Sequence, residues 1–200
     1  MTELFTAGSS FASVAFVALT VYAHLKRREL NRASTALSDY FSDPTPRVML
    51  VAYLCLSFAL VCTAMKIISE QQSTIVPGVG PASGVLMLIA ATCLVPVALT
   101  TRRDLGVDRR SVRTRSMHRV LALVAFVAIV IAMVAYSMLG FPTDHRYQRA
   151  IRMWAILLST FAMMVFGLLT QLPPGSRYYG LIQKLLVALV ATWVLISGWA

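Results

Sequence analysis

The chain has 200 residues, of which 58% are hydrophobic and 13% charged, and its mean hydropathy is +0.73. A soluble domain has a charged fraction of about 25%, so this composition argues against an ordinary soluble fold. The net charge of +10 would suit nucleic acid, but the basic residues flank apolar stretches, where the positive-inside rule already places them. Nucleic acid is therefore not an expected partner, and an anionic lipid surface accounts for the charge.

Six apolar windows are long enough to cross the hydrocarbon core, which takes roughly 20 residues. Each is expected to be a helix, because lipid supplies no hydrogen-bond partners and the alternation of a barrel strand is absent. The predicted fold class is all-α, a single polytopic bundle of six transmembrane helices with no soluble domain. The predicted spans are residues 4–24, 48–68, 83–100, 120–141, 153–172 and 180–199.

The distribution of basic residues predicts the orientation of these spans. Most of the 18 Lys and Arg residues lie in or beside the first, third and fifth connections. Because cytoplasmic loops carry the excess of positive charge, we expect these connections in the cytoplasm. Both termini are then expected on the non-cytoplasmic side.

Small residues on the fourth span predict how it packs. They recur every three or four positions, which places them on one helix face where another helix can approach closely. We expect this face to pack the bundle, with an oligomer interface as the alternative. Its residues are Ala122, Ala125, Ala128, Ala132 and Ala135.

Ionisable residues within the spans are few. No Asp or Glu lies in a span interior, which argues against a proton- or ion-coupled transporter, since such a site usually needs a buried charge. Lys66, Arg152 and Lys184 lie near helix ends, and we expect their long side chains to reach the interface.

Catalytic and metal-binding signatures are also missing. The sequence has no G-x-S-x-G turn, no H-E-x-x-H pair and no phosphate-binding glycine loop. The three cysteines (Cys55, Cys62 and Cys93) lie in spans without metal-ligand spacing and are expected to behave as small apolar residues. No metal site and no catalytic residue is predicted.

A group of polar residues is expected at the cytoplasmic ends of the spans. A carboxylate near His118 would stabilise its imidazolium form, and such a group could bind a lipid headgroup or a partner. The alternative is that the acidic residues only offset nearby arginines in solvated loops. The candidate polar cluster consists of Ser38, Asp39, Asp104, His118, Gln183 and Lys184.

Two histidines allow a different hypothesis. His24 ends the first span and His118 begins the fourth, so both are expected at the same membrane boundary. Two histidines on facing helices can be the axial ligands of a haem iron. No attachment motif or second histidine pair accompanies them, so no cofactor is expected, and haem stays as an alternative.

Short motifs give the chain a resemblance to a known family. Residues Ala36-Leu37-Ser38-Asp39-Tyr40 are similar to a Leu-Ser-acidic element, and Gly180-Leu181-Ile182-Gln183-Lys184 to a GL-x-QR opening of the last helix. Both are features of the prokaryotic membrane proteins grouped as domain of unknown function 998. In that family an FPTD-like stretch precedes a histidine in the third connection. Here residues 100–104 lack the proline, so Asp104 and His118 are the matching positions, and an FPTD sequence occurs instead at 141–144.

The resemblance implies a six-helix fold with a polar cluster at one membrane face, in a bacterial or archaeal plasma membrane. Three functional interpretations stay open. The first is a non-catalytic accessory or assembly protein that acts through its helix faces, with a membrane protein or a second copy as partner. The second is a lipid-handling protein or enzyme with a polar site at the cytoplasmic interface, and the third is a haem-binding electron carrier. Membrane lipids are expected contacts in every case.

Overall fold

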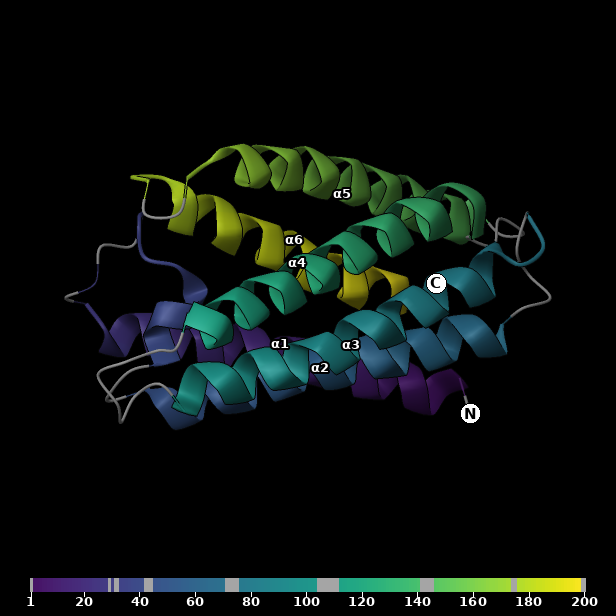
Figure 1. Cartoon of the computed structure of the whole chain (residues 1–200). Coiled ribbons are helices and arrows are strands. Elements are labelled where there is room, and N and C mark those ends of the chain that lie inside the picture. The colour runs from purple at the N-terminus through teal and green to yellow at the C-terminus, as the bar shows by residue number, and fades with distance from the viewer. Residues whose placement is uncertain are drawn as a thin grey trace.

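The structure is a computed structural model, which describes residues 2–28, 30, 33–41, 45–70, 76–103, 112–140, 146–173 and 176–198. Within these ranges, six helices are long and apolar enough to cross a membrane (Figure 1). The predicted all-α fold of six apolar helices is thereby confirmed, and the protein is a multi-pass integral membrane protein. The helices are α1 (Thr2–Lys26), α2 (Pro46–Ser69), α3 (Val79–Arg103), α4 (Val112–Ala135), α5 (Arg146–Gln171) and α6 (Tyr179–Gly198).

Two short elements complete the described fold. The 3-10 helix η1 (Leu37–Phe41) lies in the first connection, and the π-helix η3 (Tyr136–Gly140) continues α4. A π-helical turn shifts the backbone hydrogen bonds by one residue and often marks a specialised position in a helix. In this fold η3 widens the end of α4 beside α5 and α6.

Each of the six helices begins before its predicted span. α4 begins at Val112 rather than at 120, and α3 begins at Val79, within a Pro-Gly-rich stretch that sequence patterns favour as a turn. Apolar length measures the hydrocarbon thickness, whereas a helix continues into the interface as long as its own hydrogen bonds form. Proline is tolerated in a first helical turn, which explains why α3 accepts Pro81.

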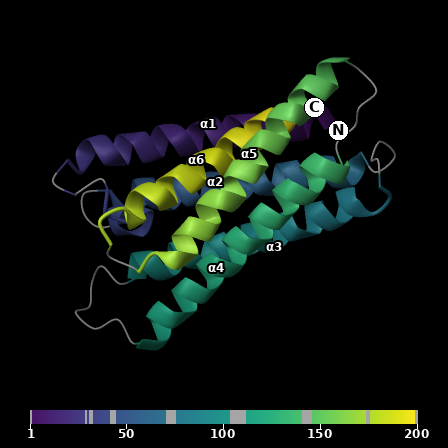
Figure 2. The ribbon, with the colours of Figure 1, turned by 90° about the horizontal axis from the view of Figure 1, so that it is seen from above.

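Neighbouring helices in the chain pack against one another from α1 to α4, while α6 packs on α5, α1 and α2. Figure 2 shows α1 at one side of the bundle and α4 at the other, with α6 and α2 between them. The largest side chains in the described core include Phe16, Leu60, Met87 and Trp193. α5 presents a broad apolar face outward, with Trp154, Leu157 and Phe161 exposed, as expected for a surface in contact with lipid tails.

One end of the bundle carries both the start of α1 and the end of α6. There the Lys66 ammonium donates hydrogen bonds to the carbonyl oxygens of Ser197 (3.2 Å) and Gly198 (2.9 Å), at the end of α6. The Lys66 side chain is buried, with 5% of its surface exposed. The Lys66 ammonium thus lies against a helix end rather than in solvent: the last carbonyls of a helix lack intrahelical donors, and this cation satisfies two of them.

Arg152 on α5 has a comparable role at the same end. Its guanidinium donates to the carbonyl oxygens of Ser137 and Met138 in η3. Trp193 of α6 donates from its indole nitrogen to the Ser137 hydroxyl at 2.8 Å. Arg152 and Trp193 together join α5 and α6 to η3.

The opposite end is called the basic face here, because the exposed cations Lys26, Arg28, Arg47, Arg119 and Arg177 lie there. This face also carries the first connection and the start of α6. The Leu181 amide donates to the carbonyl of Ala33 at 2.8 Å. The first connection therefore folds back over the start of α6 (Figure 1). Its η1 packs on α2, α3 and α6 and contacts α1 through Tyr40 and His24.

Candidate functional site

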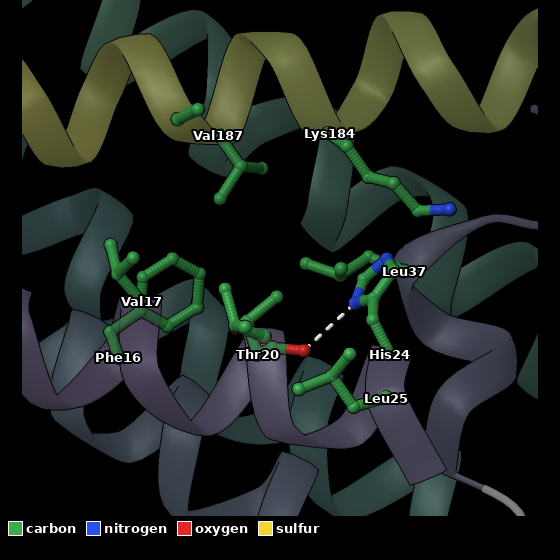
Figure 3. Close-up of a pocket in the computed structure, with 10 residues that line it drawn as sticks. Phe16, Val17, Thr20, His24, Leu25, Leu37, Lys184 and Val187 are labelled. Atoms are coloured by element: carbon green, nitrogen blue, oxygen red, sulfur yellow. Dashed lines mark hydrogen bonds between the residues drawn. The ribbon is translucent and has the colours of Figure 1, made fainter. Parts of the chain in front are cut away.

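A pocket of about 360 Å³ opens between α1 and α6 in the half of the bundle next to the basic face. Its walls are almost entirely apolar. α6 contributes Val187 and Ala188, and η1 contributes Leu37. The α1 wall consists of Phe16, Val17, Thr20, Val21, His24 and Leu25, and Lys184 lies at the mouth on α6 (Figure 3).

Polar and aromatic groups gather at one end of the pocket. The His24 ring stacks on the buried Tyr40 ring, with centroids 4.2 Å apart and planes 25° apart. The Lys184 ammonium lies 4.9 Å from the centroid of the same Tyr40 ring and donates to its hydroxyl at 3.4 Å. Figure 3 shows the imidazole and the lysine chain at the same end of the apolar walls. We call His24, Tyr40 and Lys184 the polar triad.

The orientation of His24 is fixed from within α1. Its Nδ1 lies 2.8 Å from the carbonyl oxygen of Thr20. Because a carbonyl oxygen can only accept, Nδ1 carries the hydrogen. The Thr20 hydroxyl, one turn earlier on α1, is buried and has no hydrogen-bond partner among the described residues.

η1 holds Tyr40 in place through local hydrogen bonds. The Asp39 carboxylate accepts from the Ala36 amide at 2.8 Å, which closes the turn before η1. At the other end of η1, the Thr45 hydroxyl donates to the Tyr40 carbonyl at 2.6 Å. Side chains of this kind compete with regular helix formation and favour short turns. The sequence around Tyr40 therefore favours the short helix η1 over an open loop.

Two contacts attach η1 and the residues just before it to α6. The Gln183 side-chain oxygen accepts from the Leu37 amide at 2.8 Å. One turn earlier, a Cβ atom on Gly180 would overlap the backbone of Thr35. Glycine at position 180 thus permits the close approach that lets Gln183 and Lys184 reach η1.

The family model described as protein of unknown function DUF998 matches residues 10–200. The chain belongs to the DUF998 family. No curated protein and no solved structure matches it. The family description assigns no biochemical function, so any function of this DUF998 protein must be argued from its own residues.

The structure brings together part of the predicted polar cluster. Asp39, Gln183 and Lys184 all meet at η1. Ser38 lies in η1, but its side chain is outside the described part, and Asp104 lies outside the described residues altogether. His118 is partly buried on α4, at the side of the bundle away from α1 (Figure 2).

The positions of His24 and His118 bear on the haem hypothesis. Bis-histidine ligation requires these two residues on facing helices, but α1 packs on α2 and α6, whereas α4 packs on α3 and α5. His24 instead faces Tyr40. The geometry of the DUF998 protein therefore gives no support to bis-histidine ligation by this pair.

The predicted alanine face of α4 turns largely inward. Ala125, Ala128 and Ala132 are buried, while Ala122 and Ala135 are partly buried. Small residues also bring α1 close to its neighbours: a Cβ on Gly8 would lie 3.0 Å from the Cys62 sulfur. These placements describe packing within one copy of the chain.

Sequence reasoning missed Tyr40 as a site residue and missed the pocket walls. Tyr40 stands beside two of the predicted polar residues in the motif at 36–40, and an aromatic ring there was an available signal. The pocket walls carried no such signal, since Val17 and Val187 resemble every other apolar residue of their spans. The sequence also singles out His24, but beside His118 rather than beside Tyr40.

Proposed function

We propose that this DUF998 protein binds a membrane amphiphile, with the apolar chain in the α1–α6 pocket and the polar head at the triad. The observation that carries the proposal is the position of His24 and Lys184, both packed on the buried Tyr40 ring, at the end of an otherwise apolar pocket. Ligand pockets combine mostly apolar walls with a few convergent polar groups. These groups also lie next to the basic face, where the proposal places the lipid headgroups.

The proposal includes an orientation. The basic face is taken as cytoplasmic, because it collects exposed lysines and arginines and cytoplasmic loops carry that excess. The membrane is taken as a prokaryotic plasma membrane. The pocket then accepts amphiphiles from the cytoplasmic leaflet, and the first connection and α6 form its headgroup end.

The proposed activity is binding rather than catalysis. The triad supplies hydrogen-bond donors and a cation, and the proposal assigns it no nucleophile or general base. The accessory or assembly role that the sequence suggests stays a prediction. A lipid-binding subunit would be one form of such a role, but the described residues identify no partner surface.

The test is to identify what copurifies with the protein. The chain is purified from its membrane in a mild detergent, and bound lipids are extracted and measured by mass spectrometry per mole of protein. Ala188→Trp places a large side chain in the pocket and should remove the bound amphiphile. Leu185→Trp is the matched control, since Leu185 is exposed on the same helix and does not line the pocket.

Retention of the same lipids by both variants, at the same ratio, would contradict the proposal. The lipids would then be part of the general shell around the helices. A thermal melt of each variant confirms that the comparison concerns folded protein.

A further inference from the structure

In a bilayer, the apolar walls of the pocket cannot by themselves select a ligand. A lipid tail in the membrane is already surrounded by hydrocarbon, and lipid tails are as apolar as the valine and leucine side chains that would replace them. Moving a tail into the pocket therefore gains little of the hydrophobic free energy that drives binding from water. Selection must come from the polar end of the pocket.

That end is rich in donors and positive charge. Lys184 carries a cation with three donor hydrogens and no acceptor, and its ammonium is held over the Tyr40 ring. The Tyr40 hydroxyl accepts from it at 3.4 Å. Charge-assisted hydrogen bonds to an anion are roughly twice as strong as those between neutral groups.

The charged residues around the triad also favour an anionic headgroup. Lys26 and Arg28 are exposed at the end of α1, on the same face as the triad. Asp39 is the acidic residue of η1, and its carboxylate accepts from the Ala36 amide of its own turn. Among the described residues at this end, the exposed cations Lys26 and Arg28 together with Lys184 outnumber the one carboxylate, Asp39, and a negative headgroup complements that balance.

The size of the pocket limits the apolar part of the ligand. Its volume of about 360 Å³ is near the lower end of ligand pockets, which span roughly 300–1,000 Å³. Its walls run along little more than two turns of α1, from Phe16 to Leu25. This volume suits one chain segment rather than the two tails of an ordinary phospholipid.

We infer that the ligand is a single-chain amphiphile with an anionic head, and that Lys184, supported by Tyr40 and His24, is the residue that selects it. This inference rests on the proposed function and names its ligand class. A carboxylate, as in a free fatty acid, and a phosphate monoester, as in a long-chain alkyl phosphate, share the required chemistry. The test therefore includes both.

The experiment uses the full chain in nanodiscs of phosphatidylcholine, with a fluorescent fatty acid as the displaced probe. Three competitors share one chain and differ in the head: oleyl alcohol, oleate and oleyl phosphate. We expect at least one of the two anions to displace the probe about tenfold more effectively than the alcohol, since hydrogen bonds to charged groups contribute about that much. The more effective anion shows whether the site binds a carboxylate or a phosphate headgroup.

Variants distinguish the selecting residue from general surface charge. In Lys184→Gln, the two anions should displace the probe no better than the alcohol does. In Lys184→Arg, the anions should still displace it better than the alcohol. Arg177→Gln is the control, since Arg177 is exposed on the same face outside the pocket. An equal loss in Arg177→Gln and Lys184→Gln would overturn the inference, because a basic surface attracts anionic amphiphiles without any specific site.

The outcome also separates this inference from the proposed function. If all three competitors bind equally and Ala188→Trp abolishes their binding, the pocket is a lipid site without a preference for anions, and the inference fails alone. If Ala188→Trp changes nothing for any competitor, the proposed function itself fails.

Discussion

The imidazole of His24 and the ring of Tyr40 lie stacked, with their centroids 4.2 Å apart. This contact joins the end of α1 to η1. Because Lys184 lies over the same ring, Tyr40 connects α1 to α6 as well. The shape of the pocket therefore depends on one aromatic side chain in the first connection.

Replacing Tyr40 tests this dependence. Tyr40→Leu removes both ring contacts, and we expect it to destabilise the protein by about 1–3 kcal/mol, the range for a lost aromatic pair and a lost cation–π contact. Tyr40→Phe retains the ring and should cost less. Thermal unfolding in detergent measures both, and equal losses in the two variants would show that the hydroxyl rather than the ring holds this end together.

A second prediction concerns Gly180. Gly180→Ala introduces a methyl group that overlaps the Thr35 backbone, so the first connection must move away from α6. We expect lower thermal stability and weaker binding at the triad. Gly167→Ala is the matched control, because a Cβ there meets nothing within 4 Å and alanine is favoured over glycine within a helix. Equal melting temperatures for the two variants would contradict the close approach.

A third prediction concerns Lys66, which caps the end of α6. Lys66→Met leaves the carbonyls of Ser197 and Gly198 without its two hydrogen bonds and should destabilise the protein by about 2–3 kcal/mol. Lys66→Arg retains a cation and should recover part of the loss. Thermal unfolding of the three proteins checks this, and full stability of Lys66→Met would show that the cap contributes nothing.

Glu70 gives this cap a dependence on pH. Its carboxylate lies 3.9 Å from the Lys66 ammonium, and burial raises its pKa, while Lys66 partly opposes the rise. A carboxyl whose pKa is raised by folding stabilises the protein below its ordinary pKa and loses this contribution as pH rises through the folded value. Lys66→Met removes the opposing charge, so its stability should fall more steeply with rising pH in this window.

The control for this pH effect is Lys66→Met combined with Glu70→Gln. The double variant has no titrating group at position 70, and its stability should no longer fall with pH more steeply than that of the unaltered chain. A slope as steep as that of Lys66→Met alone would assign the pH dependence to another group.

A further prediction concerns Arg152, which donates to two carbonyls of η3. Arg152→Met should destabilise the packing of α5 against η3 by about 1–3 kcal/mol, the cost of leaving such acceptors without a partner. Arg149→Met changes an exposed arginine one turn earlier and serves as the control. Hydrogen exchange of the η3 amides measures the effect locally. No difference between the two variants would mean that Arg152 does not hold η3.

The six helices could be predicted because hydrocarbon thickness sets a length that apolar residues must fill. The side-chain contacts at the ends of the helices could not. Lys66, Arg152 and Lys184 are similarly placed near helix ends, and the same argument predicts for all three that they reach toward water. The structure shows Lys66 buried against the end of α6 and Arg152 bound to η3, because carbonyls that lack donors lie within their reach.

The candidate site was predictable in part. Asp39, Gln183 and Lys184 were selected from motifs, and the fold brings them to one place because Gly180 lets the first connection approach α6. The sequence pairs His24 with His118 only in the haem alternative, and the packing reveals that Tyr40 is its neighbour. The pocket depends on the spacing of α1 and α6, which no residue in either helix encodes on its own.

The most direct test of the account is photo-crosslinking in vesicles with a fatty acid that carries a diazirine in its chain. After irradiation and digestion, mass spectrometry locates the labelled residues. We expect labelling concentrated in 16–25 of α1 and 187–188 of α6, and its loss in Ala188→Trp. Labelling spread evenly over exposed apolar faces, such as that of α5, with no enrichment between α1 and α6, would contradict the proposal that this DUF998 protein binds an amphiphile in the pocket.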